Sequence, residues 1–171
     1  MQNAAKMNVT KKLWPKRQGI VFLTIILILG FTSFSFGQTK YFTTYGSLAD
    51  SLEKVYGIPA PIILGVAFHE SGAGKSQVAT LLNNHFGIKG KNDLVKTHNI
   101  KSAYKYYATV ADSYAGFCKV ISSKKYYPTL KGTSNIDTWL TAISNAGYAA
   151  NAVTWKASIL RVIRIYSLDK K

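Results

Sequence analysis

The sequence predicts an α+β fold in which helices predominate and a small β-lobe flanks a cleft. Apolar residues recur at helical spacing in several stretches after Tyr41. The stretch from Phe86 to Tyr107 lacks this spacing, is polar and contains short extended pieces, as expected of a β-lobe or a mobile loop. With 47% hydrophobic residues in a chain of 171, the sequence can bury one core.

The first half of the helical region is expected to contain three helices. An apolar stripe over residues 48–55 stops at Gly57, which predicts a helix that ends there. Two prolines then open a second helix, Ile62–Glu70, and Gly72 lies just past its end. A short third helix is predicted over residues 76–82.

Three more helices are expected in the second half of the chain. Apolar residues recur at helical spacing over 114–121, over 136–143 and over 155–166. Ser134 or Asn135 would cap the middle one of these, because both side chains can accept a hydrogen bond from a backbone N–H of the first turn.

Residues 1–37 have the pattern of an export signal. Four basic residues precede an uncharged apolar run, as in the basic and hydrophobic parts of a signal peptide. Ser35 and Gly37 place small residues at the −3 and −1 positions of a cut before Gln38. We therefore expect a signal peptide over residues 1–37, or an uncleaved N-terminal anchor. Residues 38–171 would then form an exported domain in the periplasm, in the cell envelope or outside the cell.

The chain is strongly basic, with 22 Lys and Arg residues against 7 Asp and Glu residues and a formal net charge of +15. Residues 1–37 hold five of the cations and no acid, so +15 less 5 leaves +10 on the exported domain. Such an excess attracts polyanions. Because the domain is expected to be exported, we expect anionic envelope polymers as partners rather than nucleic acid. Membrane contact is expected only through residues 1–37, if they stay attached.

Acids are scarce, so the position of Glu70 is informative. It follows Ile63, Val66 and Ala67 at spacings of seven, four and three, which places its carboxyl on the apolar face of its helix. It also lies in the last turn, where the helix dipole disfavours an anion. Both effects favour the neutral carboxylic acid, the form that can protonate a leaving oxygen. The alternative is a glutamate paired with a lysine or a backbone N–H.

Two other motifs near Glu70 are incomplete. Gly74-Lys75-Ser76 resembles the end of a phosphate-binding loop, but His69 stands where the upstream glycine is required. His69 and Glu70 begin like a zinc-protease motif, but Ala73 stands where the second histidine is required. No cluster of residues implies a metal or a cofactor.

Ordered motifs in the exported domain resemble those of a known family. The segments that carry the resemblance are Glu70-Ser71-Gly72-Ala73-Gly74-Lys75-Ser76, Asn83-Asn84-His85-Phe86-Gly87-Ile88-Lys89-Gly90 and Gly147-Tyr148-Ala149-Ala150-Asn151. With these motifs, residues 45–168 resemble the bacterial glucosaminidases of glycoside hydrolase family 73, also described as mannosyl-glycoprotein endo-beta-N-acetylglucosaminidase-like. That family includes flagellar and autolytic peptidoglycan hydrolases.

The resemblance implies a lysozyme-like fold and hydrolysis of the β-1,4 bond between N-acetylglucosamine and N-acetylmuramic acid in peptidoglycan. By position, Glu70 matches the family's general acid. Tyr148 matches a tyrosine across the cleft that contacts the substrate's acetamido group or the attacking water. The loop that shapes the floor of the site is matched by Asn83, Asn84, Phe86 and Gly87. For Phe86, packing in the core is an equal alternative.

The sequence departs from the family where a second carboxylate is expected. Residues 96–107 contain no acid, and Ser102 stands about where a glutamate would be. Three accounts remain, in this order. The substrate's own acetamido oxygen assists or Glu70 acts as a lone acid; Asp93 swings in on a mobile lobe to activate water; or catalysis has been lost. Asp112, at the start of a later helix, is interpreted as an N-cap.

Two other functions remain open. A muramidase or lytic transglycosylase would use the same single acid and cut the other glycosidic bond. A non-catalytic wall-binding module would rely on positive charge and on tyrosines that stack on sugar rings, and Tyr107 is a candidate for such a substrate contact.

Overall fold

The structure of the protein is a computed structural model that describes residues 39–92 and 102–170. These residues fall within one of the two units into which the chain divides, Gly37–Lys171. The expected signal peptide, residues 1–37, lies outside the described residues and stays a prediction. None of the helices in the described ranges combines the length and the apolar character that crossing a membrane requires.

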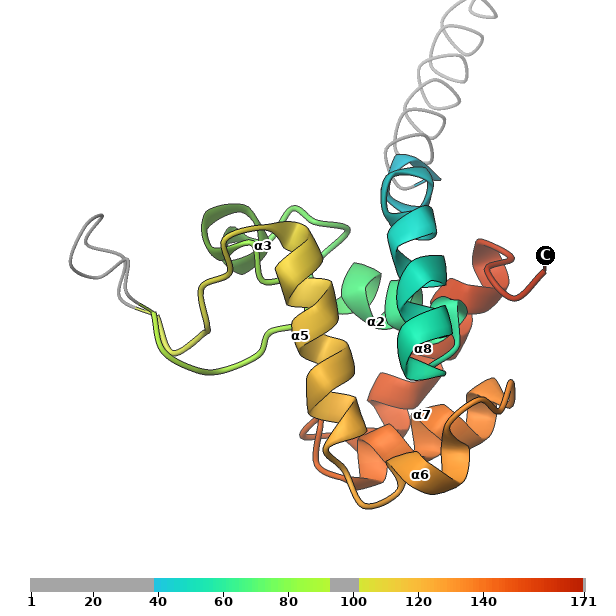
Figure 1. The fold of residues 1–171 in the computed structure, drawn as a ribbon. Helices are drawn as coiled ribbons and strands as arrows, with labels where there is room; N and C mark the ends of the chain where they lie inside the picture. The colour runs from blue at the N-terminus through green and yellow to red at the C-terminus, as the bar shows by residue number, and fades with distance from the viewer. Residues whose placement is uncertain (1–38, 93–101, 171) are drawn as a thin grey trace, which may run out of the picture. The chain divides into compact units, whose positions relative to one another are not determined.

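Helices make up most of the described fold (Figure 1). The first covers residues 39–56 and ends at Gly57, as predicted. The helices that follow are α2 (Ala60–Glu70), α3 (Gln77–Leu82), α5 (Val110–Ser122), α6 (Tyr127–Leu130), α7 (Ile136–Asn145) and α8 (Ala152–Ile165). The predominantly helical character of the predicted fold is confirmed, and α6 is an addition that the apolar spacing did not indicate.

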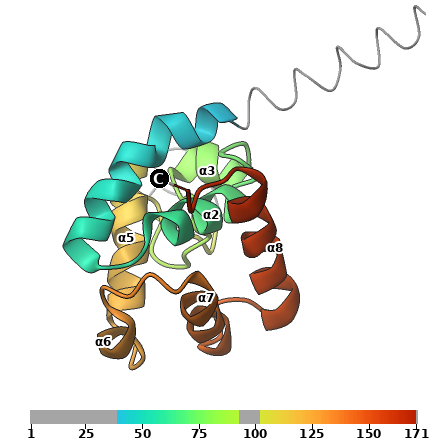
Figure 2. The ribbon, with the colours of Figure 1, turned by 90° about the vertical axis from the view of Figure 1, so that its right-hand side faces the viewer.

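Helix α2 lies at the centre of the described unit and packs against α5, α7 and α8 (Figure 2). Its residues from Ala60 to Ala67 are all buried. A helix that is apolar all round is expected to be covered on every side, because it has no polar face to turn to water. Only the last turn of α2 reaches the surface, and the helix ends there at Glu70.

The close approach of α8 to α2 depends on Gly65. A Cβ built on Gly65 would lie 3.1 Å from a side-chain carbon of Ile163 and 3.2 Å from one of Ile159. Glycine weakens a helix interior by about 0.5–1 kcal/mol relative to alanine, but here it gives α8 room to pack directly on the α2 backbone. Because the two helices run in opposite directions at this contact, the beginning of α8 meets the end of α2 and Trp155 reaches Glu70.

A hydrogen-bonded turn ends α2 directly after Glu70. The Ser71 hydroxyl donates to the Ala67 carbonyl at 2.6 Å and accepts from the Gly74 N–H at 2.8 Å. Gly74 has a φ of 78° and a Cβ there would lie 3.2 Å from the Tyr41 ring, so both backbone conformation and space require glycine. The turn therefore sets the position of Glu70 at the helix end.

Side-chain caps explain where several helices begin. Ser76 caps α3, and Asn135, one of the two residues expected at this position, caps α7. The N-cap prediction for Asp112 is wrong by three residues, because Thr109 is the N-cap of α5. Thr109 Oγ1 accepts from the Asp112 N–H, and the Asp112 carboxylate accepts from the Thr109 N–H at 3.0 Å. Asp112 thus completes a reciprocal capping box at the third helical position.

The predicted small β-lobe is wrong for the described residues. The strand pairing found in them is one isolated antiparallel bridge between Lys89 and Tyr104. The Asn84 side chain holds this stretch instead, since its amide donates to the carbonyls of Ile88 (2.8 Å) and Lys105 (2.9 Å). A two-stranded pairing alone is marginally stable in water, and here a buried amide takes over part of its hydrogen bonding. The described parts of this segment, residues 86–92 and 102–107, form a hydrogen-bonded loop.

Candidate active site

A pocket of about 590 Å³ lies beside the C-terminal end of α2. Its size falls within the roughly 300–1,000 Å³ that small-ligand sites occupy. The lining comes from Glu70, from the loop 86–89 with Tyr104, from residues between 120 and 126, and from the end of α7 up to Tyr148. The expected cleft is therefore present, but helices and loops form it rather than a β-lobe.

Glu70 is half-buried in this pocket and is held by an uncharged donor. The indole Nε1–H of Trp155 donates to Glu70 Oε1 at 2.6 Å. The other oxygen, Oε2, faces Gly87, where a built Cβ would lie 3.8 Å from it. The partner of Glu70 is thus an indole and not the lysine or backbone N–H considered from the sequence. The indole N–H is uncharged, so it adds no positive charge beside the Glu70 carboxyl.

Tyr148 lies close to Glu70 and shares the contact with Trp155. The two ring centroids, of Tyr148 and Trp155, are 5.4 Å apart, and the Tyr148 hydroxyl donates to the Phe86 carbonyl at 2.9 Å. Burial raises the pKa of Tyr148 well above its ordinary value, and the charge of Glu70 adds to this rise. The phenol therefore stays neutral. Its proton is engaged on Phe86, so its oxygen can accept a hydrogen bond from a ligand.

Phe86 and Gly87 both line the pocket, but in different ways. The Phe86 ring is buried and stacks on Phe117 with ring centroids 4.4 Å apart, so core packing describes its side chain. Its backbone carbonyl is the part that serves the site, as the acceptor for Tyr148. Gly87 presents bare backbone to Glu70 Oε2 and leaves space in front of that oxygen.

The other three predicted substrate-binding residues, Asn83, Asn84 and Tyr107, are not among the residues that line the pocket. The Asn83 amide donates to the carbonyls of Tyr107 (2.9 Å) and Ala108 (3.2 Å). Asn84 is buried and binds the backbone of the loop that carries Gly87. Tyr107 is only 6% exposed, so its ring offers no free face to a sugar. These three residues support the loop, and none of them is a proposed substrate contact.

Glu70 is the single carboxylate among the described pocket-lining residues. Three other described acids bind elsewhere: Glu53 accepts from the Ala60 N–H, Asp112 belongs to the α5 capping box, and Asp137 pairs with Lys156. Asp93 lies outside the described residues, so the account in which it activates water stays a prediction.

Sequence reasoning missed the residue that binds Glu70 and the cations on the pocket lining. Trp155 was assigned to an apolar helix stripe, although its indole N–H needs an acceptor and acceptors of negative charge are scarce in this chain. Lys89 and Lys124 line the pocket with exposed side chains. The overall positive charge indicated such cations but not their positions.

A buried polar cluster supports the turn that follows Glu70. The Tyr41 hydroxyl lies 2.7 Å from His85 Nδ1, 2.9 Å from the Tyr114 hydroxyl and 3.5 Å from the Ser71 hydroxyl. Burial lowers the pKa of His85 from 6.5 to about 4. His85 is therefore neutral at neutral pH, and its ring can be buried without a counter-charge.

Comparisons with known proteins bear on the family of the chain and on its fold. Residues 46–168 match the glucosaminidase family model, described as mannosyl-glycoprotein endo-beta-N-acetylglucosaminidase. A relative is the exo-glucosaminidase LytG of Bacillus subtilis (strain 168), 26% identical over 151 residues that cover 78% of this chain and 53% of the relative. The chain thus spans about half the length of that relative.

Two solved structures share the fold. One is the catalytic domain of the autolysin Auto from Listeria monocytogenes, with a TM-score of 0.64 and 18% identity over 77% of this chain and 85% of that chain. The other is the C-terminally truncated glycoside hydrolase domain of FlgJ from Salmonella typhimurium, with a TM-score of 0.61 and 17% identity over 77% and 98% of the respective chains.

Proposed function

The chain belongs to the glucosaminidase family of glycoside hydrolases, as its motifs indicated, and from this premise we propose that it cleaves peptidoglycan. The bond cut is the β-1,4 bond between N-acetylglucosamine and N-acetylmuramic acid, and Glu70 is the general acid. One observation carries the proposal: Glu70 is the single carboxyl on the described pocket lining, and an indole rather than a cation holds it.

The acid step follows from the two different surroundings of the Glu70 oxygens. The proton on Oε2, which faces Gly87 and the pocket, passes to the glycosidic oxygen as the bond from the sugar C1 to that oxygen breaks. The electron pair of the broken bond stays on the leaving oxygen. Oε1 remains hydrogen-bonded to Trp155, which stabilises the carboxylate formed by the transfer.

The second group is proposed to be the substrate's own acetamido oxygen, which bonds to C1 as the leaving oxygen departs. Water then breaks that bond and gives its proton to the Glu70 carboxylate, which restores the acid. The Tyr148 oxygen, whose proton is engaged on Phe86, accepts from the acetamido N–H and so raises the electron density on the acetamido oxygen. Activation of water by Asp93 ranks second. Loss of catalysis ranks third, because a pure binding module has no use for such a carboxyl.

Two cations beside the pocket suit a substrate that bears carboxylates. Lys89 and Lys124 line it, while Glu70 is the only acid on the described lining. The stem peptides of peptidoglycan carry carboxylates, and exposed lysines attract them over roughly 10 Å at 0.1 M salt. The same charges would concentrate the protein on anionic envelope polymers. We therefore propose action outside the cytoplasm, after export directed by residues 1–37.

The test is digestion of purified peptidoglycan by wild type, Glu70→Gln and Asp137→Asn. Glutamine keeps an oxygen that can accept from Trp155 but cannot donate the proton, so release of reducing ends should fall by about 10²–10⁴-fold. Asp137→Asn makes the same change in an exposed carboxylate away from the pocket lining and should leave the rate unchanged.

The sugar at the newly released end identifies the glycosidic bond that was cut. New reducing N-acetylglucosamine supports the proposal, reducing N-acetylmuramic acid indicates a muramidase, and anhydro-muramic ends indicate a lytic transglycosylase. Lysis that persists in Glu70→Gln would remove Glu70 from the catalytic role.

A further inference from the structure

Tyr104 lines the pocket that holds Glu70 and Tyr148, although it belongs to none of the motifs that indicated the family. It lies in the stretch 96–107, where a second carboxylate was expected and none is present. Its side chain is half-buried, and among the described residues it belongs neither to the hydrophobic core nor to the side chains packed on that core. Core packing therefore does not account for this ring.

The Tyr104 ring lies beside the oxygen of Glu70 that faces the pocket. A Cβ built on Gly87 would lie 3.8 Å from Glu70 Oε2 and also 3.8 Å from Tyr104 Cε1. The Tyr104 hydroxyl is not among the atoms within 4 Å of that point, so the ring itself borders the space in front of Oε2. A sugar whose glycosidic oxygen reaches Oε2 must enter this space and come close to the ring.

Backbone hydrogen bonds hold Tyr104 at this place. The residues on either side of it, Ala103 and Lys105, form backbone hydrogen bonds of 3.0 and 2.8 Å with the loop that carries Gly87. The Tyr104 N–H donates to the Ser102 hydroxyl at 3.1 Å, so the residue that stands where a glutamate was expected orders the backbone instead. A backbone that is already ordered loses little conformational freedom when a ligand binds.

The chemistry of a flat aromatic ring suits a sugar. The rings of a β-1,4-linked N-acetylhexosamine chain carry C–H bonds on their faces and polar groups around their edges. One face can pack on an aromatic side chain while the polar edge still forms hydrogen bonds. The pocket offers both kinds of contact, with polar groups at Glu70 and Tyr148 and an aromatic ring at Tyr104.

We propose that Tyr104 packs its ring against the sugar at the cleaved bond and so holds the glycosidic oxygen at Glu70 Oε2. The inference rests on the proposed function, and it adds a substrate-binding residue that the motifs do not include. The ring gives and takes no proton in this role. Its contribution is contact with the sugar, so it depends on the flat ring and not on the hydroxyl.

Substitutions at Tyr104 separate the ring from the hydroxyl. Tyr104→Phe keeps the ring, so it should bind a purified peptidoglycan tetrasaccharide within about twofold of its parent. Tyr104→Leu keeps apolar bulk but has no flat face, so binding should weaken about tenfold. The matched control is Tyr106→Leu, which removes a half-buried tyrosine from the same stretch but off the pocket lining. The control should bind like the parent.

Binding is measured by calorimetry, with each substitution placed in the Glu70→Gln protein so that the probe is not cleaved. Thermal unfolding first shows that each variant folds, and Tyr104→Met makes the same comparison if the leucine variant does not. Equal losses in the Phe and Leu variants of Tyr104 overturn the inference, because the hydroxyl would then carry the contact. An equal loss in Tyr106→Leu also overturns it, because a disturbed loop would explain both results.

A Tyr104→Leu protein that binds as its parent does, or a parent that does not bind the probe, overturns the inference as well. Failure of the proposed function gives a different result, in which wild type binds the tetrasaccharide but releases no reducing ends. The order of the Tyr104 variants in binding still decides the inference in that case.

Discussion

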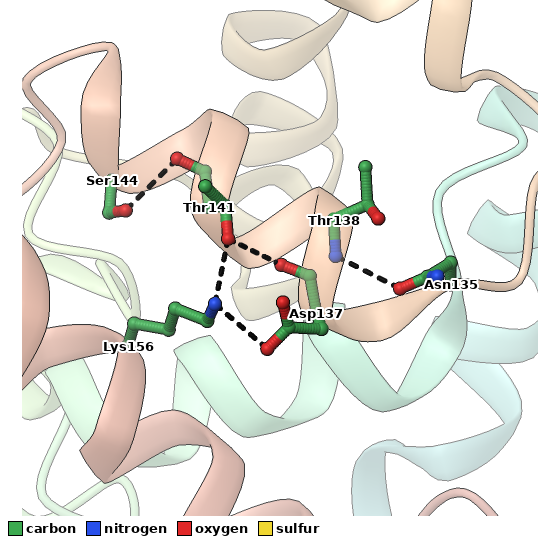
Figure 3. A network of polar contacts seen from close by, with 6 residues as sticks. All are labelled: Asn135, Asp137, Thr138, Thr141, Ser144 and Lys156. Atoms are coloured by element: carbon green, nitrogen blue, oxygen red, sulfur yellow. Dashed lines mark hydrogen bonds and ion pairs between the residues drawn. The ribbon is translucent and has the colours of Figure 1, made fainter.

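Two carboxylates in this molecule are held by neighbouring residues of α8, and they are held in opposite ways. Trp155 reaches α2 and donates its indole N–H to Glu70 at 2.6 Å. Lys156, the next residue, reaches α7, where its ammonium lies 2.8 Å from Asp137 and 2.7 Å from the Thr141 hydroxyl (Figure 3).

The difference lies in the charge of the partner and in the surroundings. Asp137 pairs with a cation at the surface, where its side chain is 67% exposed, so the pair contributes only about 0–1 kcal/mol to stability. Glu70, the proposed general acid, lines a pocket and has a neutral partner. A lysine in place of Trp155 would convert the acid into a second ion pair.

The largest expected effect is on the free energy of unfolding and comes from the buried cluster of Tyr41, His85 and Tyr114, which supports the turn after Glu70. In the described ranges, Asp137 has no such cluster beside it. The pKa of His85 falls from 6.5 to about 4 on folding, so the unfolded chain binds the proton more readily between these values. The contribution of neutral His85 to the free energy of unfolding is fully present above pH 6.5 and is lost as the pH falls towards 4. At 1.36 kcal/mol per pH unit the loss is about 3 kcal/mol.

Urea unfolding between pH 8 and pH 4 measures this loss. In His85→Gln the dependence on pH should be flatter by most of that amount, whereas Asp137→Asn should keep the slope of the wild type. An unchanged slope in His85→Gln would show that other groups carry the acid sensitivity.

The second effect tests the neutral donor itself. Trp155→Phe keeps an aromatic ring beside Tyr148 but removes the N–H that holds Glu70. Hydrogen bonds to charged groups are worth about 1.5–3 kcal/mol, so kcat/KM should fall by about 10- to 100-fold.

The control for this variant is Trp139→Phe. Trp139 is buried, lies off the pocket lining and donates to the Thr133 carbonyl at 3.1 Å. The Trp139→Phe protein should lose about as much stability as Trp155→Phe, but it should keep its activity per folded molecule. Equal kcat/KM values in the two variants would mean that the indole N–H has no part in catalysis.

The smallest effect on the free energy of unfolding is expected from the exposed ion pair of Lys156 and Asp137. Lys156→Met should lower the free energy of unfolding by no more than about 1 kcal/mol, because the pair is largely solvated. Raising the salt concentration should shrink this difference further. Peptidoglycan cleavage should be unchanged, and a tenfold drop in activity would show that the α7–α8 contact reaches the pocket.

Local sequence signals predicted most of the helical fold. Helix ends at Gly57 and Glu70 were found, and Asn135 was one of two expected caps, because prolines, glycines and capping side chains act on the backbone within four residues. The prediction of a β-lobe was wrong because its main signal was also local. The absence of a helical stripe over residues 86–107 indicated an extended chain, but it did not show that a buried Asn84 would bind that backbone.

The sequence by itself determined most of the helices and the family, and it singled out Glu70 as the candidate acid, because these follow from periodicity, from capping and from contiguous motifs. Only the tertiary structure decided what surrounds that acid. The Trp155 indole lies 85 positions away along the chain, and it reaches Glu70 because α8 packs against Gly65 in the middle of α2.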